Sequence, residues 1–279
     1  MDATDHPMRN LWMTLAYDGL PFSGWQRQAG FRTVQEELEG VLERVTGVKT
    51  SVTGASRTDA GVHSLGQTAN FRTPSGLPVS VLQRALNACL PGEIRVLSMG
   101  DAPWEFHARY HATGKRYAYR IFRGDVAPPF GRGYFAHVRY RLSLEAMREA
   151  AGYMVGRRDF AAFSTNPGYS RKSTVRTVKS LHILPRGDFL WFFVEGDGFL
   201  YNMVRTMVGT LVDVGRGRFR PREVEEILAS RDRRRAGPVM PACGLFLVRV
   251  FYRRTIEEGG GGGCVDALSR PRRLSRCTS

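Results

Sequence analysis

The sequence predicts an α+β fold made of two similar halves. Segments with strand periodicity and segments with helix periodicity occur along the whole chain. They do not alternate regularly, as they would in a doubly wound parallel sheet, and each half contains about two helices. The 279 residues allow one large domain or two of ordinary size, and an apolar content of 42% is typical of a globular protein.

The first half begins with a strand from residue 11 to residue 17. Apolar residues occupy both faces of this strand, so we expect it to lie inside a sheet, and Asp18-Gly19 ends it with turn residues. A helix follows, because Thr33 and Glu36 have the spacing of a capping box. Its apolar stripe comprises Val34, Leu38, Val41, Leu42 and Val45.

The polar stretch "GASRTDAGVHSLGQ", residues 54–67, separates two short predicted strands, "SVTGAS" and "TANFRT". Its glycines permit tight turns with positive φ. The segment "VSVLQRALNACLPGEIRVLSM" then predicts a helix, a turn and a strand.

The second half begins with a strand over residues 117–122, in "KRYAYRIF". Helices are predicted in "SLEAMREAAGYMVG", in "FLYNMVRTMVGTLVDVG", which Gly215 would end, and from near Pro221. Strands are predicted in "FLWFFVEGDG" and "GLFLVRVFYR". The resulting division is an N-terminal extension (1–10), two halves (11–108 and 109–256) and a Gly-rich, basic tail (257–279) that we expect to be disordered.

The net charge of +15, from 41 Lys plus Arg against 26 Asp plus Glu, indicates a polyanionic partner. The alternative is that the charge only keeps the protein soluble. The four cysteines have no C-x-x-C spacing, and the chain shows neither a signal-peptide pattern nor a membrane-length apolar run. We therefore expect a soluble, cytoplasmic protein that does not contact a membrane.

Three residues are candidates for chemistry. Asp59 lies in the 54–67 stretch, where nearby Arg57 would favour an ionised carboxylate able to act as nucleophile or base; the alternative is a turn aspartate. Tyr117 alternates with basic residues, as in strands that stack on bases, but this spacing also fits a core tyrosine. Arg205 sits at the margin of an apolar helical stripe, where it could extend to solvent or pair with an acid near a cleft. We interpret His63 as a hydrogen-bonded loop residue and not as catalytic.

Several basic residues could contact RNA phosphates, although each could also lie on a solvated face. They are Arg27, Arg171, Lys172, Arg176, Arg216, Arg218 and Arg220. No P-loop, dinucleotide fingerprint or metal-ligand spacing is present, so we expect neither a nucleotide cofactor nor a metal.

"GASRTDAGVHSLGQTANF" closely resembles the signature of the TruA family of tRNA pseudouridine synthases, which has the form G-R-T-D-A-G-V-H followed by G-Q. Further matches occur in order at "YDGLPFSGWQRQ", "VQEEL", "ALNACLPGEI", "FHARYHATGKRYAYRI", "FLYNMVRTMVGTL" and "GLFLVRVFY", over about residues 11–252. One departure is Ser56, where the common pattern has Gly.

The resemblance implies a pseudouridine synthase fold, in which two ferredoxin-like α/β halves with mainly antiparallel sheets join around a central cleft. It implies a homodimer that isomerises uridine to pseudouridine at tRNA positions 38, 39 and/or 40 in the anticodon stem-loop. By the same resemblance Asp59 is the catalytic aspartate and Arg57 helps to flip the target nucleotide. Tyr117 stacks on the uracil and takes part in proton transfer at C5, and Arg205 pairs with the aspartate.

The residue types suit this chemistry, since the reaction needs a carboxylate and an extruded base but no oxidant and no energy input. Asp59 could attack C1′, attack C6, or initiate loss of the base by deprotonation. The sequence leaves these three routes open, together with the choice of tRNAs and of modified positions. A non-catalytic RNA-binding or RNA-folding protein on the same scaffold is the alternative function.

Overall fold

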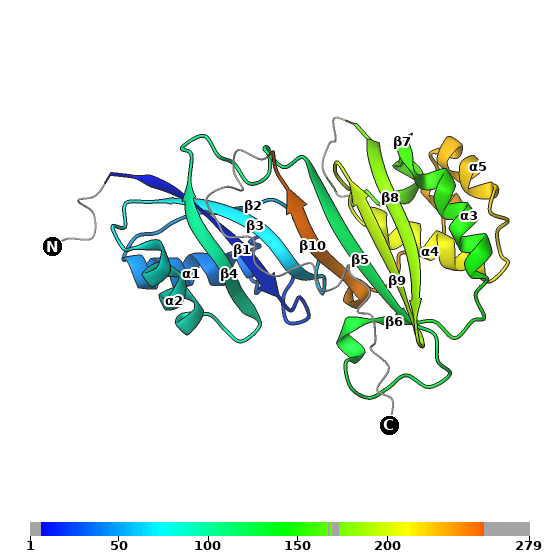
Figure 1. Ribbon diagram of the computed structural model, residues 1–279, viewed down its shortest axis with the longest axis horizontal. Coiled ribbons are helices and arrows are strands. Elements are labelled where there is room, and N and C mark those ends of the chain that lie inside the picture. Colours follow the sequence, from blue (N-terminus) through cyan, green and yellow to red (C-terminus); the bar gives the residue numbers. More distant parts are fainter. Residues whose placement is uncertain (1–6, 167, 169–172, 254–279) are drawn as a thin grey trace, which may run out of the picture.

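The computed structural model describes residues 7–166, 168 and 173–253. The molecule is elongated, with the blue and cyan N-terminal half at one end and the green and yellow C-terminal half at the other (Figure 1). The predicted 257–279 tail, together with the candidate residues Arg171 and Lys172, lies outside the described residues.

The first half has a ferredoxin-like βαββαβ order. It contains β1 (Arg9–Tyr17), α1 (Val34–Thr46), β2 (Val52–Gly54), β3 (His63–Thr73), α2 (Val79–Cys89) and β4 (Ile94–Ala102). The strands lie in the order β4-β1-β3-β2, and all neighbours in this order are antiparallel. The helix N-cap predicted at Thr33 is confirmed, since its hydroxyl accepts a hydrogen bond from the Glu36 N–H.

The second half repeats this arrangement. It contains β5 (Gly114–Phe122), β6 (Ala136–His137), α3 (Leu144–Met154), β7 (Gly156–Asp159), β8 (Val175–Arg186), β9 (Phe189–Gly196), α4 (Met203–Gly215), α5 (Glu223–Ser230) and β10 (Leu245–Phe251). The order β10-β5-β9-β8 is again antiparallel and corresponds strand for strand to the first half. The expectation of two similar α/β halves is therefore confirmed.

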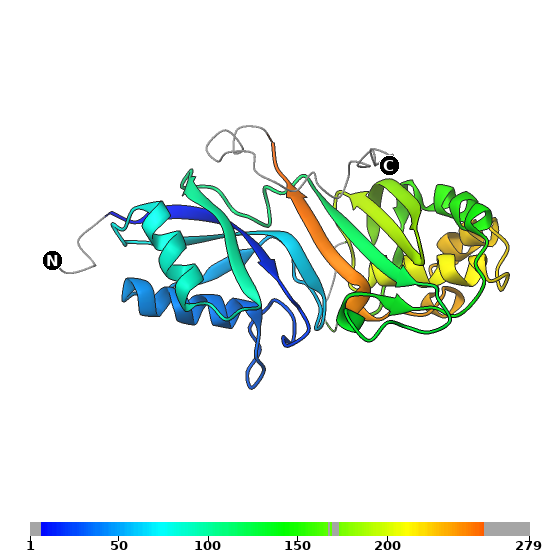
Figure 2. The same cartoon turned by 60° about the horizontal axis from the view of Figure 1, so that its bottom comes forward.

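A single sheet of ten strands runs through both halves. β10, the orange strand in Figures 1 and 2, joins them: it pairs antiparallel with β5 and parallel with the start of β3, where Phe246 lies opposite His63. β2 occupies the other end of the same β3 edge, with Val52 opposite Phe71. The segment from residue 55 to residue 62 must therefore cross the junction between the halves.

Each half has its own apolar core. Leu11, Leu38 and Leu86 are fully buried between the first part of the sheet and α1 and α2. In the second half, α4 contributes Met207 and Leu211 to a larger cluster against β5, β9 and α3. This burial fixes α4 against the sheet and therefore fixes where its first turn points.

Some expectations from the sequence were wrong. The longest strand, β8, was missed, because only a few of its side chains are buried and its apolar residues do not alternate regularly with polar ones. Strand β3 begins at His63, so that residue is in a strand and not in a loop. Gly215 is the last residue of α4, but the glycine with positive φ is Gly217; at Gly215 a Cβ would lie 2.6 Å from Sδ of Met147 on α3.

Within the described ranges, no helix is both long and apolar enough to cross a membrane.

Candidate active site

The polypeptide between β2 and β3 is held by side chains from several elements. The Gln67 amide accepts a hydrogen bond from the Ser56 N–H at 3.1 Å and donates one to the Ser56 carbonyl at 2.6 Å. The Thr58 carbonyl accepts from the Trp25 N–H at 3.0 Å. Of the three glycines expected to allow positive φ here, only Gly61 has it, at 74°; Gly54 instead leaves room for the Trp25 ring. The backbone that carries Asp59 is therefore fixed.

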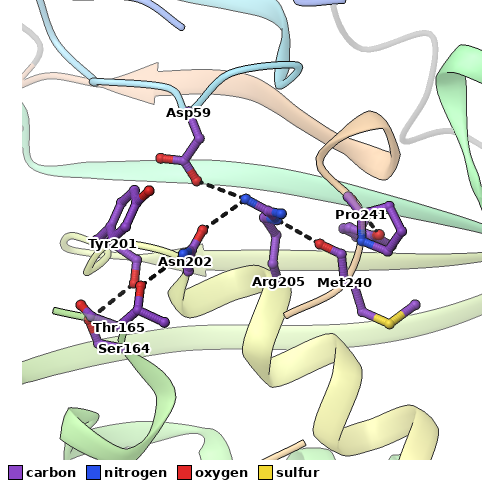
Figure 3. Close-up of polar contacts among 9 residues, drawn as sticks. Asp59, Ser164, Thr165, Tyr201, Asn202, Arg205, Met240 and Pro241 are labelled. Atoms are coloured by element: carbon purple, nitrogen blue, oxygen red, sulfur yellow. Dashed lines mark hydrogen bonds and ion pairs between the residues drawn. The ribbon is translucent and has the colours of Figure 1, made fainter. Parts of the chain in front are cut away.

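Asp59 forms an ion pair with Arg205 of α4, as the resemblance implied. Nη1 of Arg205 lies 3.2 Å from Oδ2 of Asp59, and the two side chains are 17% and 18% exposed. Arg205 also donates from Nε to the Met240 carbonyl at 2.6 Å and from Nη1 to Oδ1 of Asn202 at 2.8 Å (Figure 3). This arginine therefore does not extend into solvent but points at the carboxylate.

The electrostatic setting of Asp59 differs from the one expected from the sequence. Burial raises the pKa of its carboxyl above the ordinary value, and the charge and hydrogen bond of Arg205 oppose that rise. Arg57, which we expected to favour the ionised form, is exposed and makes no side-chain hydrogen bond or ion pair with any described residue. The cation that supports Asp59 thus comes from the other half of the molecule.

Tyr117 of β5 is 7% exposed, and its hydroxyl lies 2.8 Å from Oγ of Ser56. Burial, together with the negative charge of Asp59, raises the pKa of this phenol to about 12. Its ring packs edge-on against Phe199 with 5.2 Å between the centroids. The tyrosine is therefore a neutral phenol held in place on both sides.

A cleft of about 840 Å³ lies between the halves. Asp59, Arg57 and Tyr117 all line it, and Arg205 contacts Asp59. The structure therefore brings together all four residues to which the resemblance gave a role. Four cationic side chains of the described residues line the same cleft: Arg27, Arg57, Arg109 and Lys115. No group of three or more His, Cys, Asp or Glu residues in the described part of the chain is arranged to hold a metal ion.

Lys115 is a cleft residue that the sequence interpretation missed. Its Nζ donates to the Ala55 carbonyl at 2.7 Å. Burial, and secondarily the charges of Arg109 and Arg176, lower its pKa to about 8. Lys115 lies two residues before Tyr117 in the same strand, so the two-residue period that identified Tyr117 could have identified it too.

The predicted phosphate contacts fall into two groups. Arg27 lines the cleft and pairs with Glu39. Arg176 is close enough to Lys115 for its charge to help lower the pKa of that lysine. Arg216 and Arg218 instead pair with the buried carboxylate of Asp213, and Arg220 pairs with Glu223. These last three follow the C-terminal part of α4, at the end of the helix opposite Arg205.

His63 is 2% exposed and does not line the cleft. Its Nε2 lies 2.9 Å from the Gly133 carbonyl, and its ring stacks on Phe246. It contributes to packing at the junction of β3 and β10.

Comparisons with known proteins agree with this geometry. The sequence model of the family described as tRNA pseudouridine synthase matches residues 13–111 and 150–253. A protein from Clostridium kluyveri named tRNA pseudouridine synthase A is 44% identical over 245 residues, which cover 88% of this chain and 100% of that protein. The chain belongs to the TruA family of tRNA pseudouridine synthases.

Relatives from Acetivibrio thermocellus and Thermoanaerobacter pseudethanolicus, also named tRNA pseudouridine synthase A, are 44% and 45% identical over the same shares of the two chains. Among solved structures, the crystal structure of a Cbf5-Nop10-Gar1 complex has 12% identity and a TM-score of 0.34, covering 91% of this chain and 62% of that chain. As a TruA-family member the protein is an isomerase that converts uridine to pseudouridine in tRNA.

Proposed function

We propose that this TruA-family synthase modifies uridines at positions 38, 39 and/or 40 of the tRNA anticodon stem-loop, with Asp59 as its catalytic carboxylate. The observation that carries the assignment of Asp59 is its ion pair with Arg205 at the wall of the cleft. Of the described residues that line the cleft, Asp59 is the single carboxylate. The positions in tRNA rest on the resemblance of the 54–71 signature.

The reaction breaks the bond between N1 of uracil and C1′ of the ribose and forms a bond between C5 and C1′. C5 loses a proton and N1 gains one, so that no electrons are exchanged with another molecule. Attack by Asp59 on C1′, attack on C6 and deprotonation all require an ionised carboxylate. The contact with Arg205 favours the ionised carboxylate of Asp59, whereas burial favours the neutral acid.

We propose that Arg57 assists the extrusion of the target nucleotide. A uridine stacked in a stem cannot reach the carboxylate, so it must leave the stack, and a side chain that fills the gap offsets part of that loss. Arg57 suits this role because it faces the cleft, is exposed and is not paired with any described residue.

Tyr117 is proposed to stack on the flipped uracil and to take part in proton transfer at C5. Its neutral phenol lies beside the carboxylate in the cleft, where it could hold or pass a proton. Ser56 and Phe199 hold the ring and hydroxyl in one orientation before the substrate arrives.

The basic residues named above are proposed to bind tRNA phosphates, with Arg27 and Arg176 nearest the cleft and Arg216, Arg218 and Arg220 farther along the surface. We also propose that residues 11–108 and 109–256 form the two domains, that the protein acts as a homodimer, and that it works in the cytoplasm, where its tRNA substrate is made. Light scattering on the purified protein at several concentrations tests the dimer.

The decisive experiment substitutes Asp59→Asn and Asp59→Ala and measures tritium release from tRNA labelled at C5 of uridine. We expect no detectable turnover in either variant. Asp101→Asn, at an exposed carboxylate paired with Arg9, is the matched control and should keep the full rate. Normal turnover in an Asp59 variant would refute the assignment, and mapping of pseudouridines in the product tRNA tests the positions.

A further inference from the structure

Asn202 has an unusual backbone conformation at the start of α4. Its φ of 61° lies in the left-handed region, which among the described non-glycine residues only Asn202 and Arg231 occupy. An N-cap residue ordinarily has extended geometry, and its side chain accepts a hydrogen bond from the first turn of the helix. Asn202 has neither feature.

The side chain of Asn202 is directed toward the catalytic ion pair instead. Oδ1 accepts a hydrogen bond from Nη1 of Arg205 at 2.8 Å, while Nδ2 donates to Oγ1 of Thr165 at 2.8 Å. Figure 3 shows Asn202 between Thr165 and the arginine; Asn202 and Asp59 reach the same guanidinium nitrogen, and the Met240 carbonyl lies on the other side of the group. Both ends of the amide are therefore used, and neither caps the helix.

Arg205 needs such support because its side chain is long and would otherwise sample several rotamers. The Met240 carbonyl holds Nε, and Asn202 holds Nη1, the same atom that reaches Asp59. Two contacts at different atoms of a planar group fix its plane and its direction.

We propose that Asn202 is a positioning residue that holds the Arg205 guanidinium against the Asp59 carboxylate. This inference rests on the proposed catalytic role of Asp59. Through Thr165 the contact also reaches the segment that carries Asn166, another residue of the cleft wall. The left-handed backbone at residue 202 is then the conformation that turns the amide from the helix toward the ion pair.

The competing explanation is that asparagine is present only because it tolerates a left-handed φ better than most residues. Glycine separates the two explanations, since Asn202→Gly accepts the same backbone conformation without strain but removes the amide. Asn202→Asp keeps the size and shape of the side chain but adds a carboxylate that competes with Asp59 for Arg205.

Both variants are tested by single-turnover kinetics with saturating enzyme, from about pH 5 to about pH 9, where the acid limb of the rate profile reports ionisation of the catalytic carboxylate. We expect Asn202→Gly to change the melting temperature only modestly, because the relaxed left-handed backbone offsets part of the loss of two hydrogen bonds. The reaction should slow about tenfold or more at neutral pH, as expected for loss of a hydrogen bond to a charged group. The acid limb should move to higher pH, because Asp59 loses part of its cationic support.

Asn202→Asp should move the acid limb further in the same direction. The other charged or titratable groups that face Asp59 are unchanged in these variants: Arg205 from α4, Tyr117 and Lys115 from β5, Arg57 from its own loop, and Arg27, Arg109 and Tyr201 at the cleft wall. Arg231→Gly, at the other left-handed residue, is the matched control, with a wild-type rate and acid limb expected.

A wild-type rate and acid limb in Asn202→Gly would overturn the inference, and so would a slower rate without any movement of the limb. The Asp59→Asn variant, measured alongside, shows whether the role of Asn202 or the catalytic role of Asp59 is refuted. An active Asp59→Asn would remove the catalytic assignment itself, whereas an inactive Asp59→Asn beside a normal Asn202→Gly would refute only the role of Asn202.

Discussion

Asp59 and Arg205 are 146 residues apart in the chain, yet Nη1 of the arginine lies 3.2 Å from Oδ2 of the aspartate. The carboxylate comes from the segment between β2 and β3, and the guanidinium comes from the first turn of α4. Their contact joins the two halves at the wall of the cleft, so the site exists only when both halves are folded and joined through β10.

Replacing Arg205 should raise the pKa of Asp59 further, because burial then acts without its counterion. A smaller fraction of Asp59 would be ionised at neutral pH. We expect Arg205→Met to slow single-turnover isomerisation about tenfold or more at pH 7 and to recover part of the rate as the pH is raised. Arg205→Lys should be intermediate, since it keeps the charge but not the planar contacts. An Arg205→Met profile parallel to that of the wild type would contradict this account.

Arg57→Ala should leave stability within about 0.5 kcal/mol of the wild type, since the side chain is exposed and has no described partner. Modification of a uridine in an intact anticodon stem should slow markedly. A tRNA in which the target uridine is mismatched should be affected less, because less stacking must be broken. Equal losses on the two substrates would argue against a role in base extrusion.

The hydrogen bond between Ser56 and Tyr117 predicts non-additive effects on stability. Ser56→Ala and Tyr117→Phe should each destabilise the protein by about 1–3 kcal/mol, because each leaves a buried hydroxyl without its partner. The double variant should be less destabilised than the sum of the two, by about 1 kcal/mol in urea unfolding. Strictly additive effects would show that the hydrogen bond contributes nothing to the free energy of unfolding.

Lys115 predicts that tRNA binding depends on pH. Its pKa of about 8 lies below the ordinary lysine value, so the amine is charged at pH 7 and largely neutral at pH 9. The cleft therefore loses one positive charge over this range, and tRNA should bind a few-fold more weakly, with a smaller dependence on salt. Lys115→Arg should remove most of this change, because arginine stays protonated. Filter binding at the two pH values compares the variants, and identical pH responses would refute the prediction.

The local features of this protein follow from its sequence. Helix α1 begins where Thr33 and Glu36 predicted, and the apolar residues on both faces of β1 correctly predicted a strand inside the sheet. The signature around Asp59 was sufficient to indicate the family. Such features depend on neighbours within a few residues, where backbone geometry and side-chain period are set by the chain itself.

The tertiary structure decided the contacts between distant segments. Period and spacing tell which face of its own element a residue occupies, but not which element packs against that face. Arg57 is two residues from Asp59 but points into the cleft, and α4 supplies the ion partner Arg205 instead. Asn202 carried no sequence signal, because its proposed role depends on a left-handed backbone and on contacts across the fold. The register of β10 between β3 and β5 and the buried apolar face of α4 bring these groups together, since they fix where the first turn of that helix meets the loop.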